Sequence, residues 1–226
     1  MSDQDASDHD EEFVPSVRRG PGRTQWAAVT AVALALLFAG GAVTVASAER
    51  DEAPRIPATD SADAGFARDM SVHHQQAVEM SFIVRDRTRD ESVRRLAYDI
   101  ANTQANQRGM MLGWLDMWGL PKLQSGVEPM AWMGMGMGDS GPSDGALMPG
   151  MATNAQMDAL RKASGREAEV LYLKLMTDHH KGGVHMAQGC VQKCAPGIER
   201  DLAQGMVEAQ QSEILLMADM LAKRGA

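Results

Sequence analysis

Apolar residues recur at alternating steps of three and four along residues 66–84 and 172–190, which is the spacing of one face of an α-helix. The same spacing returns along residues 100–118 and 206–224. No segment shows the every-second-residue alternation that predicts a half-buried strand. Each pair of stretches therefore predicts a helix hairpin, and two such hairpins predict an all-α fold built as a four-helix bundle.

The two hairpins are related by an internal repeat, because residues 66–119 align without a gap with residues 172–225, at an offset of 106. The identities cluster around one motif, Met-x-x-His-His-x-x-x-Val-x-Met, which occurs at 70–80 and again at 176–186. The repeat predicts a pseudo-symmetric bundle in which the two motifs occupy equivalent places.

The region before the bundle contains residues 26–45, which carry no charge over about 20 positions, the length that spans a bilayer as a helix. Arg18, Arg19 and Arg23 precede this segment and predict that the chain enters the cell membrane once, with residues after 48 outside the cytoplasm. A signal peptide cleaved near Ala48 is the alternative. Residues 1–25 form a polar tail that we expect to be disordered and cytoplasmic, 26–48 the anchor or signal segment, and 60–226 the bundle.

Residues 120–153 are rich in Gly, Pro and Met and predict a long crossover between the hairpins. A short helix is predicted from Asn154, as its cap, to Ala163, with Ser164 and Gly165 ending it. The formal net charge of -8 argues against nucleic acid as a partner.

The repeated motif carries the strongest candidate chemistry. In a helix, its first methionine, first histidine and last methionine share a face, so their sulfur and nitrogen atoms could converge on one ion. Thioether with imidazole favours Cu(I) over Cu(II), whereas calcium and magnesium prefer oxygen. Met111 and Met217 lie on the partner helices and could add sulfur. The predicted metal ligands are Met70, His73, His74, Met80, Met176, His179, His180, His185, Met186, Met111 and Met217.

The alternative for these residues is ordinary core packing, since methionine stripes and single histidines are common in helical cores. Two repeated histidine pairs are harder to explain in that way, because buried imidazoles without partners cost free energy. His185 replaces Glu79 of the first repeat, which predicts that the second site is the tighter one. Gln107 and Glu213 lie on the inner faces of the partner helices, either orienting imidazoles or forming an interhelical hydrogen-bond ladder, as do Gln104 and Gln210.

Two further groups leave alternatives open. Met130, Met133, Met135 and Met137 in the crossover have the spacing of flexible copper-capturing methionine motifs, but a Gly-rich strap explains them equally. Cys190 and Cys194 are four residues apart and could form a disulfide or a thiolate copper site.

The chain resembles the domain-of-unknown-function family 305 (DUF 305) through Tyr172-Leu173-x-x-Met176-x-x-His179-His180-x-Gly182-x-Val184-x-Met186-Ala187 and through Phe66-x-x-Asp69-Met70-x-x-His73-His74-x-x-Ala77-Val78-Glu79-Met80. The resemblance implies a ferritin-like four-helix bundle, export, and periplasmic copper binding or tolerance. It departs at Gln107 and Arg108, where the family has Glu-Ile.

We expect an extracytoplasmic copper-binding protein that sequesters, tolerates or delivers the ion. Its expected partners are the copper ion and the membrane, with a second copy of the chain and a copper-transport protein as further candidates. A membrane-tethered structural or signalling bundle without metal is the main alternative. A ferritin-like di-metal oxidase would need a carboxylate from each helix, and the inner faces offer only Glu213, so we expect no enzyme activity.

Overall fold

The computed structural model describes residues 56–135 and 143–226. The predicted membrane segment at 26–45, the tail at 1–25 and the cleavage position near Ala48 lie outside these residues. Among the residues that the structure does describe, no helix is long and apolar enough to cross a membrane.

Four long helices dominate the described chain. α2 and α3 form the first hairpin, and α5 and α6 form the second, as the repeat predicts. Ser61 caps α2 by accepting a hydrogen bond from the backbone N–H of Ala64 (3.2 Å), and Asp90 caps α3 through Val93 (3.0 Å). The bounds are Ala62–Arg87 for α2, Glu91–Met117 for α3, Gly165–Lys193 for α5 and Ile198–Ala222 for α6.

A short helix, α4 (Asn154–Lys162), precedes the second hairpin at the predicted place. Its cap is Thr153 and not Asn154, because Thr153 and Gln156 form a reciprocal capping box in which each side chain binds the other's backbone N–H. The crossover itself holds one 3₁₀ turn, η1 (Ala131–Met133).

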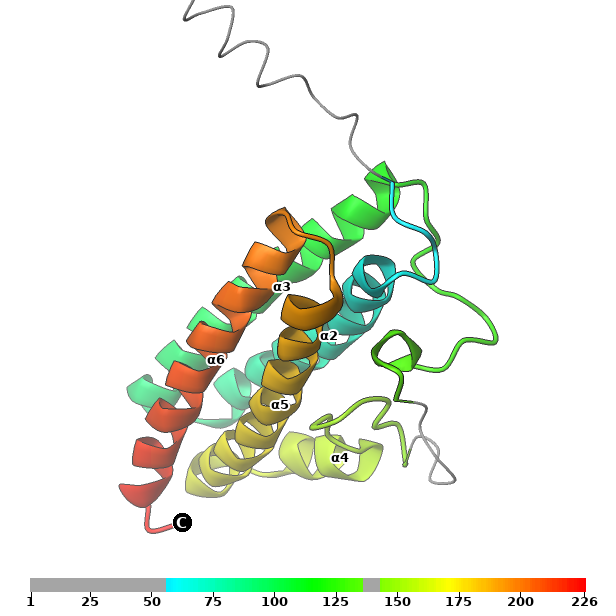
Figure 1. Ribbon diagram of the computed structural model, residues 1–226. Helices are drawn as coiled ribbons and strands as arrows, with labels where there is room; N and C mark the ends of the chain where they lie inside the picture. Colours follow the sequence, from blue (N-terminus) through cyan, green and yellow to red (C-terminus); the bar gives the residue numbers. More distant parts are fainter. Residues whose placement is uncertain (1–55, 136–142) are drawn as a thin grey trace, which may run out of the picture. The chain divides into compact units, whose positions relative to one another are not determined.

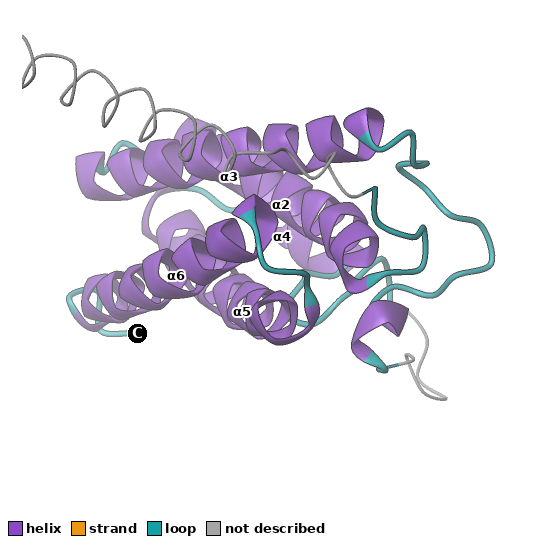
Figure 2. Cartoon of the chain, turned by 45° about the horizontal axis from the view of Figure 1, so that its top comes forward, coloured by secondary structure: helices purple, strands orange, loops and turns teal. Residues whose placement is uncertain are grey.

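The hairpins meet through α2 and α5, the two helices that carry the histidine pairs, while α3 and α6 each pack on their own hairpin partner. Figure 1 shows the four helices running side by side, with α4 short and set against the bundle. In Figure 2 the same helices are turned forward, and the crossover runs along one side of the bundle. The fold of the described residues is therefore all-helical, as predicted.

The interior consists of two apolar clusters. Cluster 1 contains Met80, Ile100, Tyr172, Met176 and Met217, with their buried neighbours. Cluster 2 contains Phe66, Met70, Met111, Met186 and Met206, with theirs. On α2 and α5 the histidines lie between the residues of the two clusters, and on α3 and α6 the glutamines and Glu213 do so. A polar layer therefore separates the clusters midway along the bundle.

The crossover is fastened to α2 at two points. Asp69 accepts hydrogen bonds from the backbone N–H of Met130 (2.7 Å) and from Nε1 of Trp132 (2.9 Å). One turn beyond the histidines, Gln76 both donates to and accepts from the backbone of Ala152, at 2.8 and 2.7 Å. These contacts hold the crossover over the middle of α2, beside the polar layer.

Candidate metal centre

The four paired histidines form a row across the bundle. His73 and His179 face each other at the α2–α5 interface, with ring centroids 3.8 Å apart. His74 lies 6.5 Å from His73 on one side, and His180 lies 6.3 Å from His179 on the other. All four side chains are fully buried. We call this set, His73, His74, His179 and His180, the imidazole row.

The outer two imidazoles are held by the partner helices. Nε2 of His74 lies 2.8 Å from Oε1 of Gln107 on α3, and Nε2 of His180 lies 2.7 Å from Oε2 of Glu213 on α6. Gln107 and Glu213 are equivalent in the repeat. The sequence left two alternatives for Gln107 and Glu213, and their contacts agree with the one in which they orient imidazoles.

The inner two imidazoles are held by backbone carbonyls. Nε2 of His179 donates to the carbonyl of His73 (2.9 Å), and Nε2 of His73 donates to the carbonyl of Pro149 in the crossover (3.2 Å). A carbonyl oxygen only accepts, so in both rings the Nε2 carries the proton. The carboxylate and amide oxygens beside the outer rings select the same tautomer.

Nδ1 of every imidazole in the row is buried and has no hydrogen-bond partner. With the proton on Nε2, each Nδ1 presents a bare lone pair to the interior. Histidines that bind metals commonly use one ring nitrogen as ligand while the other donates to a carbonyl or carboxylate. The row therefore has the hydrogen-bond arrangement of metal ligands, and its orphaned nitrogens fit a bound ion.

Glycines allow the crossover to approach the row. A Cβ on Gly182 of α5 would lie 1.9 Å from the carbonyl oxygen of Pro149, and one on Gly150 would lie 2.3 Å from the carbonyl oxygen of Asp178. Gly150 also has a φ of 78°, which side chains rarely adopt. Sequence reasoning missed Pro149, because a backbone carbonyl leaves no mark in a residue pattern.

Burial keeps the imidazoles of His73, His74 and His179 neutral. Loss of hydration lowers the pKa of His73 to about 4 and that of His74 to about 3. The pKa of His179 is well below its ordinary value, first because of burial and then because of its histidine neighbours. Neutral imidazoles can bind a metal ion near neutral pH without first losing a proton.

The six predicted methionine ligands are all fully buried, and they fall on both sides of the row. Within one motif, Met70 and Met80 lie in different clusters, and ten residues of helix separate them by ~15 Å. The expectation that both would meet one ion is therefore wrong. Each side combines methionines of both hairpins: Met70, Met111 and Met186 lie in cluster 2, and Met80, Met176 and Met217 lie in cluster 1.

Nitrogen alone does not complete a compact site. Within residues 56–135 and 143–226, no three imidazoles bring ring nitrogens within 4.8 Å of one another. An ion at the row would take further ligands from elsewhere, and the flanking thioethers are the soft donors packed on either side of it. The donor set of neutral imidazole and thioether suits Cu(I).

His185 does not join the row. Its side chain is exposed on α5, whereas His179 and His180 are buried. The equivalent residue, Glu79, is also at the surface, where it pairs with Arg161. The two halves therefore differ at the surface here and not in the row, which removes the reason for expecting a tighter second site.

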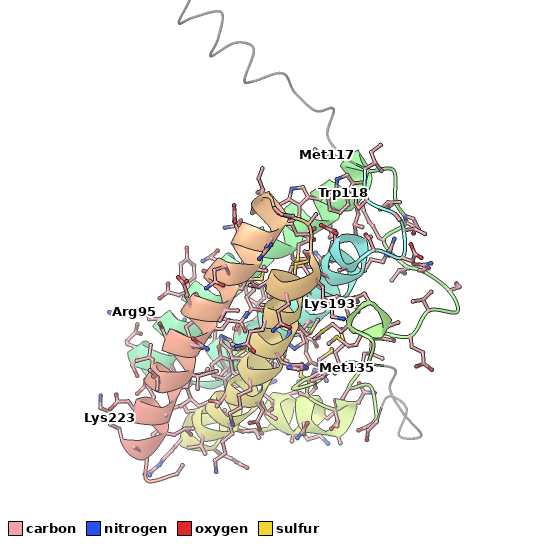
Figure 3. The ribbon with its side chains drawn as sticks, viewed as in Figure 1. Arg95, Met117, Trp118, Met135, Lys193 and Lys223 are labelled. Carbon is pink, nitrogen blue, oxygen red and sulfur yellow. A yellow bond between two sulfur atoms is a disulfide. The ribbon has the colours of Figure 1, made fainter. Side chains whose placement is uncertain are left out.

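The remaining candidates take structural positions. Both amide atoms of Gln104 and Oε1 of Gln210 are buried without a hydrogen-bond partner, so none of these atoms orients an imidazole. Met130 is buried in cluster 2, and Met133 packs over Gly189 of α5. Figure 3 shows Met135 at the crossover; Met137 lies outside the described residues.

Cys190 and Cys194 form a disulfide with a Cα separation of 4.8 Å, so of the two alternatives for this pair the structure has the covalent one. It lies at the end of α5, remote from the row.

Comparison with known proteins gives the same fold. The chain is 68% identical to a DUF305 protein from Streptomyces coelicolor, described as a candidate secreted protein, over 75% of this chain and 97% of that one, with a TM-score of 0.69. A DUF305 fragment from Deinococcus radiodurans is 28% identical over 72% and 96%, with a TM-score of 0.58. CopM, solved in a Cu(I)-bound form, is 20% identical over 71% and 96%, with a TM-score of 0.53, and shares the fold.

No curated protein matches the chain. The family described as "Domain of unknown function (DUF305)" matches residues 63–221, which is most of the chain and includes both histidine motifs. The chain belongs to the DUF305 family.

Proposed function

We propose that this protein binds copper outside the cytoplasm, as Cu(I) in preference to Cu(II), and that it sequesters the ion or passes it on. The imidazole row supplies nitrogen ligands, and the methionines of each cluster supply sulfur on their own side of the row, so that no single ion binds both Met70 and Met80. The observation that carries the proposal is the row's hydrogen bonding: four buried Nδ1 atoms have no partner while each Nε2 has one.

The chemistry of the surrounding donors supports copper over other metals. Both apolar clusters that flank the row contain buried thioethers, which bind soft ions and are poor ligands for calcium or magnesium. Zinc also binds imidazole, so it is the thioethers of the two clusters, and not the imidazoles, that favour copper over zinc.

Proteins of this fold have been seen with such ions. CopM has been solved in Cu(I)-bound, Cu(II)-bound and silver-bound forms. The relative from Streptomyces coelicolor is described as a candidate secreted protein, which supports a location outside the cytoplasm. This agrees with our interpretation of residues 26–45 as a membrane anchor or a signal segment. At 20% identity CopM supports the choice of metal only through the shared fold.

Binding without catalysis is part of the proposal. Among the described residues, Glu213 is the one carboxylate that hydrogen-bonds an imidazole of the row, whereas a di-metal oxidase would need a carboxylate from each helix. The row also lies fully buried, which suits retention of an ion.

Anaerobic titration of the full chain, kept in a mild detergent, with Cu(I), Cu(II) and Zn(II) tests the proposal. We expect the tightest binding for Cu(I), and a rise in melting temperature when copper binds, because a ligand that binds the folded state stabilises it. His73→Ala/His74→Ala and His179→Ala/His180→Ala should each lose stoichiometric copper. If the histidines serve only packing, neither double variant should lose copper relative to the wild type, and copper should not raise the melting temperature.

A further inference from the structure

A second cluster of ligand atoms lies at one end of the bundle. Asp63 in the first turn of α2, Cys194 after α5 and Glu199 in the first turn of α6 bring two carboxylate oxygens and one sulfur within 4.8 Å of one another. Cys190 adds a second sulfur through its bond to Cys194. Asp63 precedes His73 by ten residues of helix, so this end cluster lies ~15 Å from the imidazole row along α2.

Glu199 is the unusual member of the end cluster. Its side chain is only 6% exposed, and neither carboxyl oxygen has a hydrogen-bond partner. Burial, followed by the charge of Asp63, raises its pKa to about 9. A buried carboxyl group without partners is costly, and it points to a ligand that the disulfide form does not hold.

The internal repeat shows that the fold does not require this carboxyl group. At the offset of 106, Val93 takes the place of Glu199 and is fully buried in cluster 1. Val84 and Thr88 take the places of Cys190 and Cys194. The two cysteines and the glutamate thus depart from the repeat together, at one site.

The opposite end of the bundle also shows how a carboxylate is normally satisfied there. Glu169, the equivalent of Asp63, accepts from Oγ1 of Thr88 (2.5 Å) and from Nε of Arg224 (2.8 Å). The position of Arg224 is occupied by Trp118 in the first repeat, so no cation takes that place at the end cluster. Figure 3 shows Trp118 and Lys223 at opposite ends of the bundle.

We propose that reduction of the Cys190–Cys194 disulfide creates a redox-controlled site for a zinc-like divalent cation, with the two thiolates, Glu199 and Asp63 as ligands. Tetrahedral zinc has ligands at ~2.0–2.3 Å, which places ligand atoms about 3.5 Å from one another. The ligand atoms of Asp63, Cys194 and Glu199 already lie within 4.8 Å of one another, and the Cys190 sulfur, once released from Cys194, has to turn toward them to complete the site. A set of two sulfurs and two oxygens suits zinc, whereas Cu(I) would need only the sulfurs.

The redox step requires an external dithiol. It transfers two electrons and two protons to the Cys190–Cys194 disulfide and becomes a disulfide itself, and the two thiols then lose their protons as they bind the cation. The oxidised sulfurs cannot act as thiolate ligands, so the disulfide closes the site. This inference does not rest on copper binding at the imidazole row.

Zinc retention in the oxidised and reduced full chain tests the proposal. Both forms, kept in detergent under nitrogen, are titrated with Zn²⁺ alone, and zinc bound at the row contributes equally to each. We expect the reduced form to hold one zinc ion more than the oxidised form. Cys190→Ser/Cys194→Ser should lose this ion, and Glu199→Val should bind it at least about tenfold more weakly, as should Glu199→Gln.

Two controls keep the result specific. Asp201→Asn alters an exposed carboxylate in the same turn of α6 and should leave the additional zinc unchanged. Since valine stands at the equivalent place in the first repeat, oxidised Glu199→Val should melt no earlier than the wild type. Equal zinc in the two redox forms, full zinc affinity in both Glu199 variants, or failure of Glu199→Val to fold would each overturn the proposal.

Discussion

Each imidazole of the row combines two properties that conflict in a simple core. The ring is fully buried, yet one of its nitrogens has no partner. The neighbouring Nε2 contacts hold the proton away from that nitrogen, and burial holds the pKa of His73 and His74 far below the ordinary value. For His73 and His74 the result is a neutral, oriented ligand, and this has consequences for both acid stability and copper affinity.

Acid should destabilise the metal-free protein. The unfolded chain takes up protons near the ordinary histidine pKa of 6.5, whereas folded His73 and His74 do so only at about 4 and about 3. Below pH 6.5 the unfolded state therefore binds more protons, so the free energy of unfolding falls as the pH drops toward 3. We expect a loss on the order of a few kcal/mol in urea unfolding between about pH 7 and pH 4.

The exposed His185 supplies the control for this measurement, because His185→Ala should retain the wild-type pH dependence. A metal-free protein whose unfolding free energy stays constant over the same range would show that the histidines are not buried neutral groups.

The side chains that hold the outer imidazoles should tune the metal. Removing the Nε2 partner in Gln107→Ala or Glu213→Ala frees the ring to rotate, and we expect Cu(I) affinity to fall by about ten- to a hundredfold in each. Competition titration with a Cu(I) chelator measures the change. Gln211→Ala, at an exposed position on α6, should leave it as it is. Wild-type affinity in both variants would mean that these contacts are a hydrogen-bond ladder without influence on copper.

At the scale of elements, the hydrophobic period was sufficient to predict the helices. The steps of three and four along 66–84 and 172–190 lie on α2 and α5, and Ser164 precedes the start of α5 as expected. The crossover could not be predicted in the same way, because its position depends on contacts between residues far apart in the sequence. Asp69, Gln76 and the carbonyl of Pro149 act there through single hydrogen bonds that have no sequence period.

The close approach of the crossover to α5 should be sensitive to one methyl group. In Gly182→Ala the new Cβ would meet the Pro149 carbonyl, so the crossover must move away from His73. We expect a loss of about 1–3 kcal/mol in the free energy of unfolding, measured with urea.

Gly109→Ala is the matched control, since its Cβ would meet no atom within 4 Å and it also lies inside a long helix. That substitution should stabilise the protein by about 0.5–1 kcal/mol, because alanine restricts the unfolded chain. Equal effects of the two substitutions would contradict the described position of the crossover.

At the scale of the whole molecule, the repeat produces a pseudo-symmetric centre in which neither hairpin is complete. The helical period correctly predicted that both histidine pairs and the methionines face the interior of the bundle, but not that the two pairs meet in one row. It wrongly grouped Met70 with Met80, since a pattern along one helix does not show which helix packs on it. The packing of α2 on α5 instead combines Met70 with Met186 and Met80 with Met176.

This grouping predicts how paired substitutions should act. Met70→Leu/Met186→Leu and Met80→Leu/Met176→Leu each remove sulfur from one side of the row while nearly keeping side-chain volume. We expect both variants to weaken Cu(I) binding to a comparable extent in competition titrations, with little change in melting temperature. Met157→Leu, in cluster 1 but on α4, should bind normally. An effect confined to one of the two pairs would contradict the symmetric centre.

X-ray absorption at the copper edge of the Cu(I)-loaded full chain tests the central claim most directly, because it identifies the atoms bound to the ion. We expect imidazole nitrogen together with sulfur, and we expect the sulfur to persist in Cys190→Ser/Cys194→Ser, which marks it as methionine thioether. A shell of nitrogen or oxygen alone, or sulfur that disappears with the cysteines, would contradict a copper centre formed by the imidazole row and its flanking methionines.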